Sequence, residues 1–397
     1  MKLRRKLKTN TLNLSSLTLA AQQSAMNFRI SMLVLILLTI GVSAFAQNKQ
    51  SFSVKIEQHI EGEGDEVFTA GNVLFVTERD SVSQRFYLKK YDLNSGKKIG
   101  EVKLPDSLNK APGFAIEGDF IYLHYTGVIT KFSMSKQKQV WRKEYGSNWS
   151  AHIGPELLGD YVGIALDDLV LLLDKETGIT IAEIRGDDFD QSIFVVDDYF
   201  FYGYFEDEIL VAHNIKTNKQ AWQMNLGGDL AVFAPLPDGN TLYLPSSRAN
   251  MYALNKKTGK QIWKMEAGEE LMNSCGSGFN GQPILYKDTL YNLQRETGLW
   301  VIDKNAGKVA DTIDFYENVS WQIHEYKGQF IIVGEETIYS FNPANRAINE
   351  LMKIPDNDAC YPTVSFSGTH IILEYIGCYD LAPKVEVYNL EMLVNVK

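Results

Sequence analysis

The sequence predicts an all-β fold, an eight-bladed β-propeller whose blades are four-stranded antiparallel sheets. A small polar residue that ends one strand and starts a turn recurs at spacings of 41, 41, 40, 41, 48, 39 and 47 residues. A fixed period of that size in strand-rich sequence is typical of radial or stacked repeats. The 20 Tyr, the 20 Phe and a hydrophobic content of 45% favour a well-packed β core. The recurring turn residues, here called anchors, are Asp92, Ser133, Asp174, Asn214, Asn255, Asp303, Asn342 and Asn389.

Each anchor is followed by residues that suit a tight turn. An Asp or Asn side chain bonds the backbone two residues on and so starts the turn. Gly or Asn stands four residues after several anchors, and these residues tolerate a positive φ, so we expect this position to need one. Trp141, Trp222 and Trp263 come eight residues after their anchors and are expected to bury their rings against the neighbouring unit. The residues four after an anchor include Gly96, Gly178, Asn218, Gly259 and Gly307.

Each unit reads as four short strands joined by turns. In the fifth unit we predict strands at Leu230–Leu236, Thr241–Pro245, Asn250–Leu254 and Lys260–Ala267. The second unit, residues 113–145, repeats this order. A four-stranded sheet has two faces to cover, and radial stacking of the sheets covers both, which is the propeller arrangement.

The eighth unit determines how the ring closes. Its fourth strand would need residues beyond Lys397, whereas Phe52–Gln58 alternates as a strand and precedes the first unit. We predict that this N-terminal strand supplies the outer strand of the eighth blade, because an open ring would leave sheet edges exposed. Seven blades are the alternative, with the two longest spacings then read as inserted loops.

Residues 1–46 are interpreted as an N-terminal extension and secretory signal. Arg29 begins a short basic region, Met32–Val42 is almost wholly apolar, and Ala44–Ala46 is a small-x-small cleavage pattern. Cleavage is expected after Ala46, which leaves residues 47–397 as a single propeller domain without a stable membrane span. The protein is then exported, periplasmic or extracellular. In the alternative interpretation, the uncleaved segment anchors it to a membrane.

Charge argues against nucleic acid as a partner. The chain carries 39 Lys and Arg against 49 Asp and Glu, a formal net charge of −10, and residues 1–46 contribute basic residues but no acidic ones. The mature part is therefore more acidic still, whereas nucleic-acid binding needs a basic surface. We expect a monomer that binds an envelope or secreted protein.

Three cysteines are present, and two of them flank a predicted hairpin. Cys360 and Cys378 would lie at the same end of the hairpin formed by Tyr361–Phe366 and Thr369–Tyr375. This placement is compatible with a disulfide in an oxidising compartment and equally with two buried thiols. No zinc-type ligand spacing occurs, so no metal site is predicted.

Ala253–Trp263, which reads ALNKKTGKQIW, resembles the docking motif A-x-D-x-x-T-G-K-x-x-W of the pyrroloquinoline-quinone (PQQ) repeat propellers, with Asn255 in place of Asp. Leu173–Gly178 is a weaker copy. The resemblance implies one of two groups. Quinoprotein dehydrogenases use PQQ and calcium, whereas non-enzymatic scaffolds include the propeller of the outer-membrane β-barrel assembly machinery. One propeller architecture carries many functions, so the motif does not decide between them.

We expect a non-enzymatic scaffold that mediates protein–protein interaction in the cell envelope, including outer-membrane protein assembly, with no catalytic residue and no cofactor. Function would reside in loops at one face of the ring, for which Tyr145–Gly154, Gly268–Gly281 and Asp314–Gln322 are the candidates. The alternative is a PQQ-dependent dehydrogenase or another small-molecule enzyme that uses the central funnel, with PQQ and calcium as cofactors.

Two W-x-x-H segments are the ligand-binding candidates of that alternative. Trp149 with His152 precedes the third blade, and Trp321 with His324 precedes the seventh, so the two pairs would face each other across an eight-bladed ring. Aromatic rings near the axis would stack on a flat quinone or sugar. The competing explanation is packing between blades, because residues three apart on a strand point to opposite faces.

Overall fold

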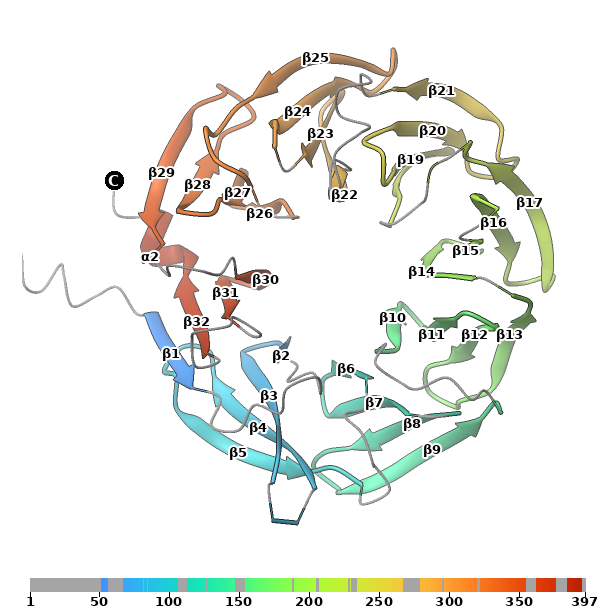
Figure 1. Ribbon diagram of the computed structural model, residues 1–397, viewed down its shortest axis with the longest axis vertical. Coiled ribbons are helices and arrows are strands. Elements are labelled where there is room, and N and C mark those ends of the chain that lie inside the picture. The colour runs from blue at the N-terminus through green and yellow to red at the C-terminus, as the bar shows by residue number, and fades with distance from the viewer. Residues whose placement is uncertain are drawn as a thin grey trace, which may run out of the picture. The chain divides into compact units, whose positions relative to one another are not determined.

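The computed structural model describes one compact unit within residues 51–397. Its strands form eight four-stranded antiparallel sheets arranged around a ring, as Figure 1 shows. The predicted eight-bladed propeller is therefore confirmed. The described ranges are 51–55, 67–80, 82–83, 85–105, 113–125, 127–146, 154–187, 189–204, 207–227, 229, 234–266, 279–294, 296–319, 322–354, 362–375 and 384–394.

The first four blades follow one another along the chain, each as a simple meander from the ring axis outward. Blade 1 holds β2 (Val67–Ala70), β3 (Val73–Arg79), β4 (Phe86–Asp92) and β5 (Lys98–Lys103); blade 2 holds β6 (Gly113–Glu117), β7 (Phe120–Tyr125), β8 (Val128–Ser133) and β9 (Lys138–Glu144); blade 3 holds β10 (Glu156–Leu158), β11 (Tyr161–Leu166), β12 (Leu169–Asp174) and β13 (Thr180–Arg185); blade 4 holds β14 (Phe189–Val196), β15 (Tyr199–Tyr204), β16 (Ile209–Asn214) and β17 (Lys219–Asn225).

The remaining blades repeat this order until the ring closes. Blade 5 holds β18 (Leu236–Asp238), β19 (Thr241–Pro245), β20 (Met251–Asn255) and β21 (Gln261–Met265); blade 6 holds β22 (Phe279–Tyr286), β23 (Thr289–Gln294), β24 (Gly298–Asp303) and β25 (Lys308–Ile313); blade 7 holds β26 (His324–Tyr326), β27 (Gln329–Val333), β28 (Thr337–Phe341) and β29 (Ile348–Lys353); blade 8 holds β30 (Thr363–Ser367), β31 (His370–Tyr375), β32 (Lys384–Asn389) and β1 (Ser51–Lys55).

The N-terminal strand closes the ring as predicted. β1 pairs antiparallel with β32, with Phe52 opposite Val387 and Val54 opposite Val385. Val54 is buried in a cluster to which both blade 1 and blade 8 contribute. After β32, the short helix α2 (Leu390–Val394) begins with the Glu391 N–H bonded to the Asn389 carboxamide at 2.9 Å.

The first strand of blade 5 differs from its prediction. β18 begins at Leu236, where the predicted strand Leu230–Leu236 ends, and it pairs with β19 across a turn at Gly239. Upstream, the Asp229 carboxylate is already bonded to the turn between β19 and β20. Residues 230–233 of the predicted strand lie outside the described residues, and Ala234 and Pro235 belong to no strand.

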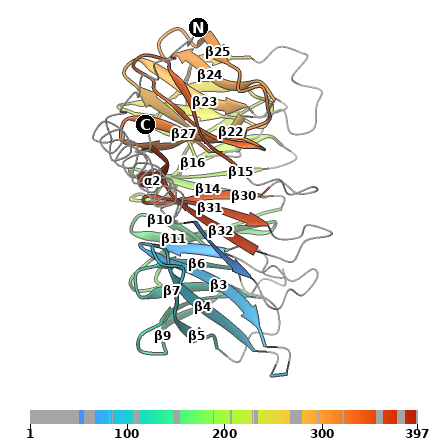
Figure 2. The same ribbon diagram turned by 90° about the vertical axis from the view of Figure 1, so that its left-hand side faces the viewer.

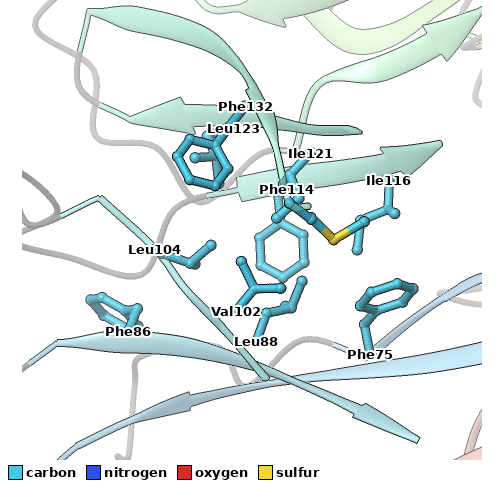
Figure 3. Packing of buried hydrophobic residues seen from close by; sticks show 11 residues of the cluster. Phe75, Phe86, Leu88, Val102, Leu104, Phe114, Ile116, Ile121, Leu123 and Phe132 are labelled. Carbon is cyan, nitrogen blue, oxygen red and sulfur yellow. The ribbon is translucent and has the colours of Figure 1, made fainter. Parts of the chain in front are cut away.

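Apolar side chains from adjacent blades fill the space between the sheets. Between blades 1 and 2, Phe75 and Leu88 from one sheet meet Phe114 and Ile121 from the other, and all four are nearly fully buried (Figure 3). Similar clusters lie at other junctions. Burial on both faces of each sheet explains the long apolar runs of the inner strands.

The anchors hold their turns by accepting backbone hydrogen bonds, as predicted. The Asp174 carboxylate accepts the Thr177 N–H at 2.7 Å, and the Asn255 carboxamide accepts that of Thr258 at 3.1 Å. Hydrogen bonds from the turns hold the pKa of the Asp92, Asp174 and Asp303 carboxyls below the usual range. The main donor is a turn hydroxyl for Asp92 and Asp174 and a backbone N–H for Asp303. The residues four after the anchors have positive φ at Gly96, Gln137, Gly178, Asn218, Gly259, Gly307 and Arg346.

The three predicted tryptophans join consecutive blades. The Nε1–H groups of Trp141, Trp222 and Trp263 donate to backbone carbonyls in the next blade, at 3.1, 2.9 and 2.9 Å. The rings lie against the turn glycines Gly178, Gly259 and Gly307 of those blades, so close that a Cβ there would overlap the indole. At the closure, Phe52 lies against Gly96 in the same way.

Candidate functional site

Of the four predicted ligand-binding residues, the structure describes only His324. Trp149, His152 and Trp321 lie outside the described residues. His324 is the first residue of β26, and blades 3 and 7 do stand on opposite sides of the ring (Figure 1).

The contacts of His324 are to the neighbouring blade. Its ring stacks on that of Phe366 with centroids 4.6 Å apart and planes 4° apart, and its Nε2–H donates to the Gly368 carbonyl at 3.2 Å. Burial lowers the pKa of the imidazole, which favours the neutral form. These contacts are those of a residue that packs blade 7 on blade 8, and a ligand role for it stays a prediction.

Other predictions fall on residues that the structure does not describe. Cys360, Cys378 and residues 1–46 are among them. In the part that is described, no helix is long and apolar enough to cross a membrane. No group of three or more His, Cys, Asp or Glu side chains in the described ranges is arranged to hold a metal ion.

One face of the ring is here called the connection face. It carries residues 226–227, Asp229 and 314–319, which lie between consecutive blades, and the turns 246–250 and 334–336 between second and third strands. A four-stranded meander places these parts at the same end, and the anchors at the other. Figure 2 views the ring from the side and shows the strands running between the two faces.

At two places on the connection face, an acid from the connecting segment binds the following turn. The buried Asp229 carboxylate accepts the Arg248 N–H at 3.0 Å and the Tyr252 hydroxyl at 3.3 Å. Two blades on, the Glu317 carboxylate accepts the Glu336 N–H at 2.5 Å and the Tyr339 hydroxyl. Each tyrosine stands three residues before its anchor, so the same arrangement of acid, turn and tyrosine occurs in two copies of the repeat.

The residues before these acids also correspond. The Asn225 side chain accepts the Gly227 N–H at 2.8 Å, and the Asp314 carboxylate accepts the Tyr316 N–H at 2.7 Å. Gly227 has φ of 66° and Tyr316 has φ of 60°. A left-handed conformation costs an L-residue about 1–2 kcal/mol, which glycine avoids. Tyr316 therefore occupies a position that another copy of the repeat gives to glycine.

Tyr316 is also the most exposed of the large hydrophobic side chains in the described ranges, with 93% of its surface accessible. The sequence prediction named the loop Asp314–Gln322 but not this residue. The signal that would have found it is the comparison of Asn225-Leu226-Gly227 with Asp314-Phe315-Tyr316, two segments that follow the outer strands of their blades.

Two glutamates near the ring axis were also missed from the sequence. Burial raises the pKa of Glu156, in β10, and of Glu374, in β31, to about 7. Glu156 keeps much of its surface exposed, whereas Glu374 is half-buried and its carboxylate also accepts the Ser365 hydroxyl at 3.3 Å. The two residues belong to blades 3 and 8, which are not adjacent in the ring.

Relative to wild type, Glu374→Gln is expected to be more stable at pH 8 than at pH 4.5. Because the folded-state pKa of about 7 lies above the ordinary value of 4.5, the folded protein holds the proton more tightly, and wild-type stability falls as the pH rises through this window. The variant lacks that titration. Urea unfolding of both proteins at several pH values measures the difference, and parallel pH profiles would contradict the expectation.

Comparison with known proteins agrees with the propeller fold and its repeat. Residues 206–340, which include both corresponding sites, match the protein family described as outer membrane protein assembly factor BamB. The resemblance to the PQQ-repeat propellers is confirmed. No curated protein matches the chain.

Solved structures share the propeller fold at low sequence identity. BamB from Moraxella catarrhalis is similar with a TM-score of 0.57 at 12% identity, over 85% of this chain and 98% of that one. A europium-containing methanol dehydrogenase reaches 0.58 at 11% identity, over 87% and 94%. A computationally designed protein, Ika8, reaches 0.61 at 12% identity, over 83% and 98%. An assembly factor, an enzyme and a design thus share the fold, which alone does not separate scaffold from dehydrogenase.

Proposed function

We propose that this chain is an exported, non-enzymatic propeller that binds a protein partner in the cell envelope, in outer-membrane protein assembly. The observation that carries the proposal is the match of residues 206–340 to a family described as an assembly factor. The connection face supports it, because its described segments are held rigidly and present a large side chain to solvent. Rigid loops lose little conformational entropy when a partner binds.

The alternative is a PQQ-dependent dehydrogenase, whose relative in fold is the methanol dehydrogenase. In that case the cofactor would supply the redox chemistry, and the ring would bind and orient it. The described residues near the axis offer His324 and Glu156, but His324 is engaged with blade 8. The scaffold proposal therefore accounts for more of the described contacts.

In vivo cross-linking of the tagged protein tests the two proposals together. We expect reproducible capture of an outer-membrane assembly component, lost when residues of the connection face are substituted and kept when exposed Ile262 on the outer rim is changed to serine. Calorimetric titration with PQQ and calcium is expected to give no saturable heat. Saturable binding of PQQ that depends on calcium, without capture of an envelope protein, would favour the dehydrogenase and overturn the scaffold.

A further inference from the structure

Tyr316 stands on a segment that is fixed on both sides. Phe315 and Val319 are buried in the cluster between blades 6 and 7. The Tyr339 hydroxyl, which donates to Glu317, also lies 3.4 Å from the Phe315 carbonyl, and Val319 forms an antiparallel bridge with Gly334. The backbone under Tyr316 is therefore held before any partner arrives.

The acid next to Tyr316 tightens this attachment. The Glu317 carboxylate lies directly against Gly334, where a Cβ would come within 2.5 Å of it, and it accepts hydrogen bonds from blade 7. Asn318 adds a bond from its side-chain amide to Glu335 at 2.7 Å. The strained φ of Tyr316 persists because these neighbours fix the loop, which is the usual situation at functional positions.

The surroundings of Tyr316 are acidic. Asp314 and Glu336 are both exposed, and Glu317 and Glu335 lie beside them in the same segment and turn. The described basic residue at the base of this turn, Lys353, donates from Nζ to the Thr337 hydroxyl at 2.8 Å. An exposed aromatic ring in an acidic setting attracts a cation both through the ring face and through the carboxylates.

We propose that Tyr316, with Asp314 and Glu336, forms a docking point for a protein segment that presents an arginine or lysine side chain. The proposal rests on the proposed protein-binding function and specifies the chemistry of the partner. The cation lies over the phenol ring while the carboxylates pair with it, and the tyrosine serves as a rigid anchor of the kind that carries much of the energy of an interface. The acidic net charge of the whole chain acts in the same direction.

The corresponding site in blade 5 shows how to remove the anchor without harming the fold. Gly227 occupies the equivalent backbone position, so Tyr316→Gly gives this segment the residue found in the corresponding segment before blade 5. Asn225 caps Gly227 just as Asp314 caps Tyr316, so Asp314→Asn keeps the cap and removes the charge. Val82, which is 91% exposed on the β3–β4 turn of the same face, provides the matched control, Val82→Ser.

A phage-displayed random peptide library, selected on the full-length protein and counter-selected on Tyr316→Gly, is the test. We expect enrichment of peptides that contain arginine or lysine. A synthetic peptide from that selection should bind Tyr316→Gly at least tenfold more weakly than wild type and Tyr316→Phe within about threefold. Asp314→Asn and Glu336→Gln should weaken binding more at low salt than at high salt. Val82→Ser should change nothing, and the melting temperature of Tyr316→Gly should equal or exceed that of wild type.

Selection of no peptide, enrichment without basic residues, or equal affinity for Tyr316→Gly would each overturn the proposal. Its failure is distinguishable from failure of the proposed function. If Tyr316→Gly still captures the same envelope protein in vivo as wild type, the scaffold function stands and Tyr316 is not its anchor.

Discussion

Replacing Trp222 with alanine is expected to lower the free energy of unfolding by about 3–5 kcal/mol, the usual cost of removing a large buried ring. Trp222 is 7% exposed, it packs at 5.7 Å edge-on to Phe201, and its Nε1–H bonds the Lys256 carbonyl of the next blade. The loss therefore falls on the junction of blades 4 and 5, and urea denaturation followed by intrinsic fluorescence and circular dichroism measures it.

Two further variants divide the effect. Trp222→Phe keeps most of the ring but leaves the Lys256 carbonyl without the indole donor, so we expect a loss of about 1–3 kcal/mol. Ile262→Ser, on the exposed outer surface of β21, should stay within about 0.5 kcal/mol of wild type. Equal stability of Trp222→Ala and wild type would show that the docked ring does not hold the blades together.

The junction chemistry is the part of the fold that the sequence predicted best. The pattern consists of an anchor such as Asp174, a glycine four residues later and a tryptophan one blade earlier. Turn formation explains the first two residues, and burial of the indole ring explains the third. Ring closure was also predictable. The alternating apolar and polar residues from Phe52 onward indicate a strand, and the eighth blade was the one that lacked a strand.

The parts that failed or were missed depend on contacts distant in sequence. β18 begins at Leu236, and upstream of it the Asp229 carboxylate binds a turn about twenty residues downstream, a contact that the local pattern does not reveal. The ligand role of His324 with Trp321 stays a prediction, and the contact that the structure shows, stacking of the His324 ring on Phe366 in the following blade, was missed. Tyr316 looks like an ordinary loop residue until its φ and its correspondence to Gly227 are known. Secondary structure follows from local pattern, whereas sites follow from the packing between units.

Replacing Ser51–Lys55 with a glycine–serine stretch of equal length is expected to open the ring. The change removes the strand that pairs with β32 along five residues and takes Val54 out of the cluster between blades 8 and 1. β32 then becomes an unprotected edge on which half-buried side chains alternate with the buried Val385 and Val387, and such an edge invites pairing with another chain. We expect a protein that unfolds at lower temperature and forms dimers or larger species, as measured by thermal denaturation and light scattering at several concentrations.

A peptide of residues 51–58, added in excess, should restore the monomer, because it supplies the missing strand in trans and binds the folded ring in preference to the open chain. A peptide with Phe52 and Val54 changed to serine keeps the backbone donors and acceptors but loses the contact with Gly96 and the buried cluster, so it should restore little. If both peptides act equally, backbone pairing with β32 alone closes the ring. If the altered protein stays monomeric and as stable as wild type, closure by β1 is not what holds blade 8 to blade 1.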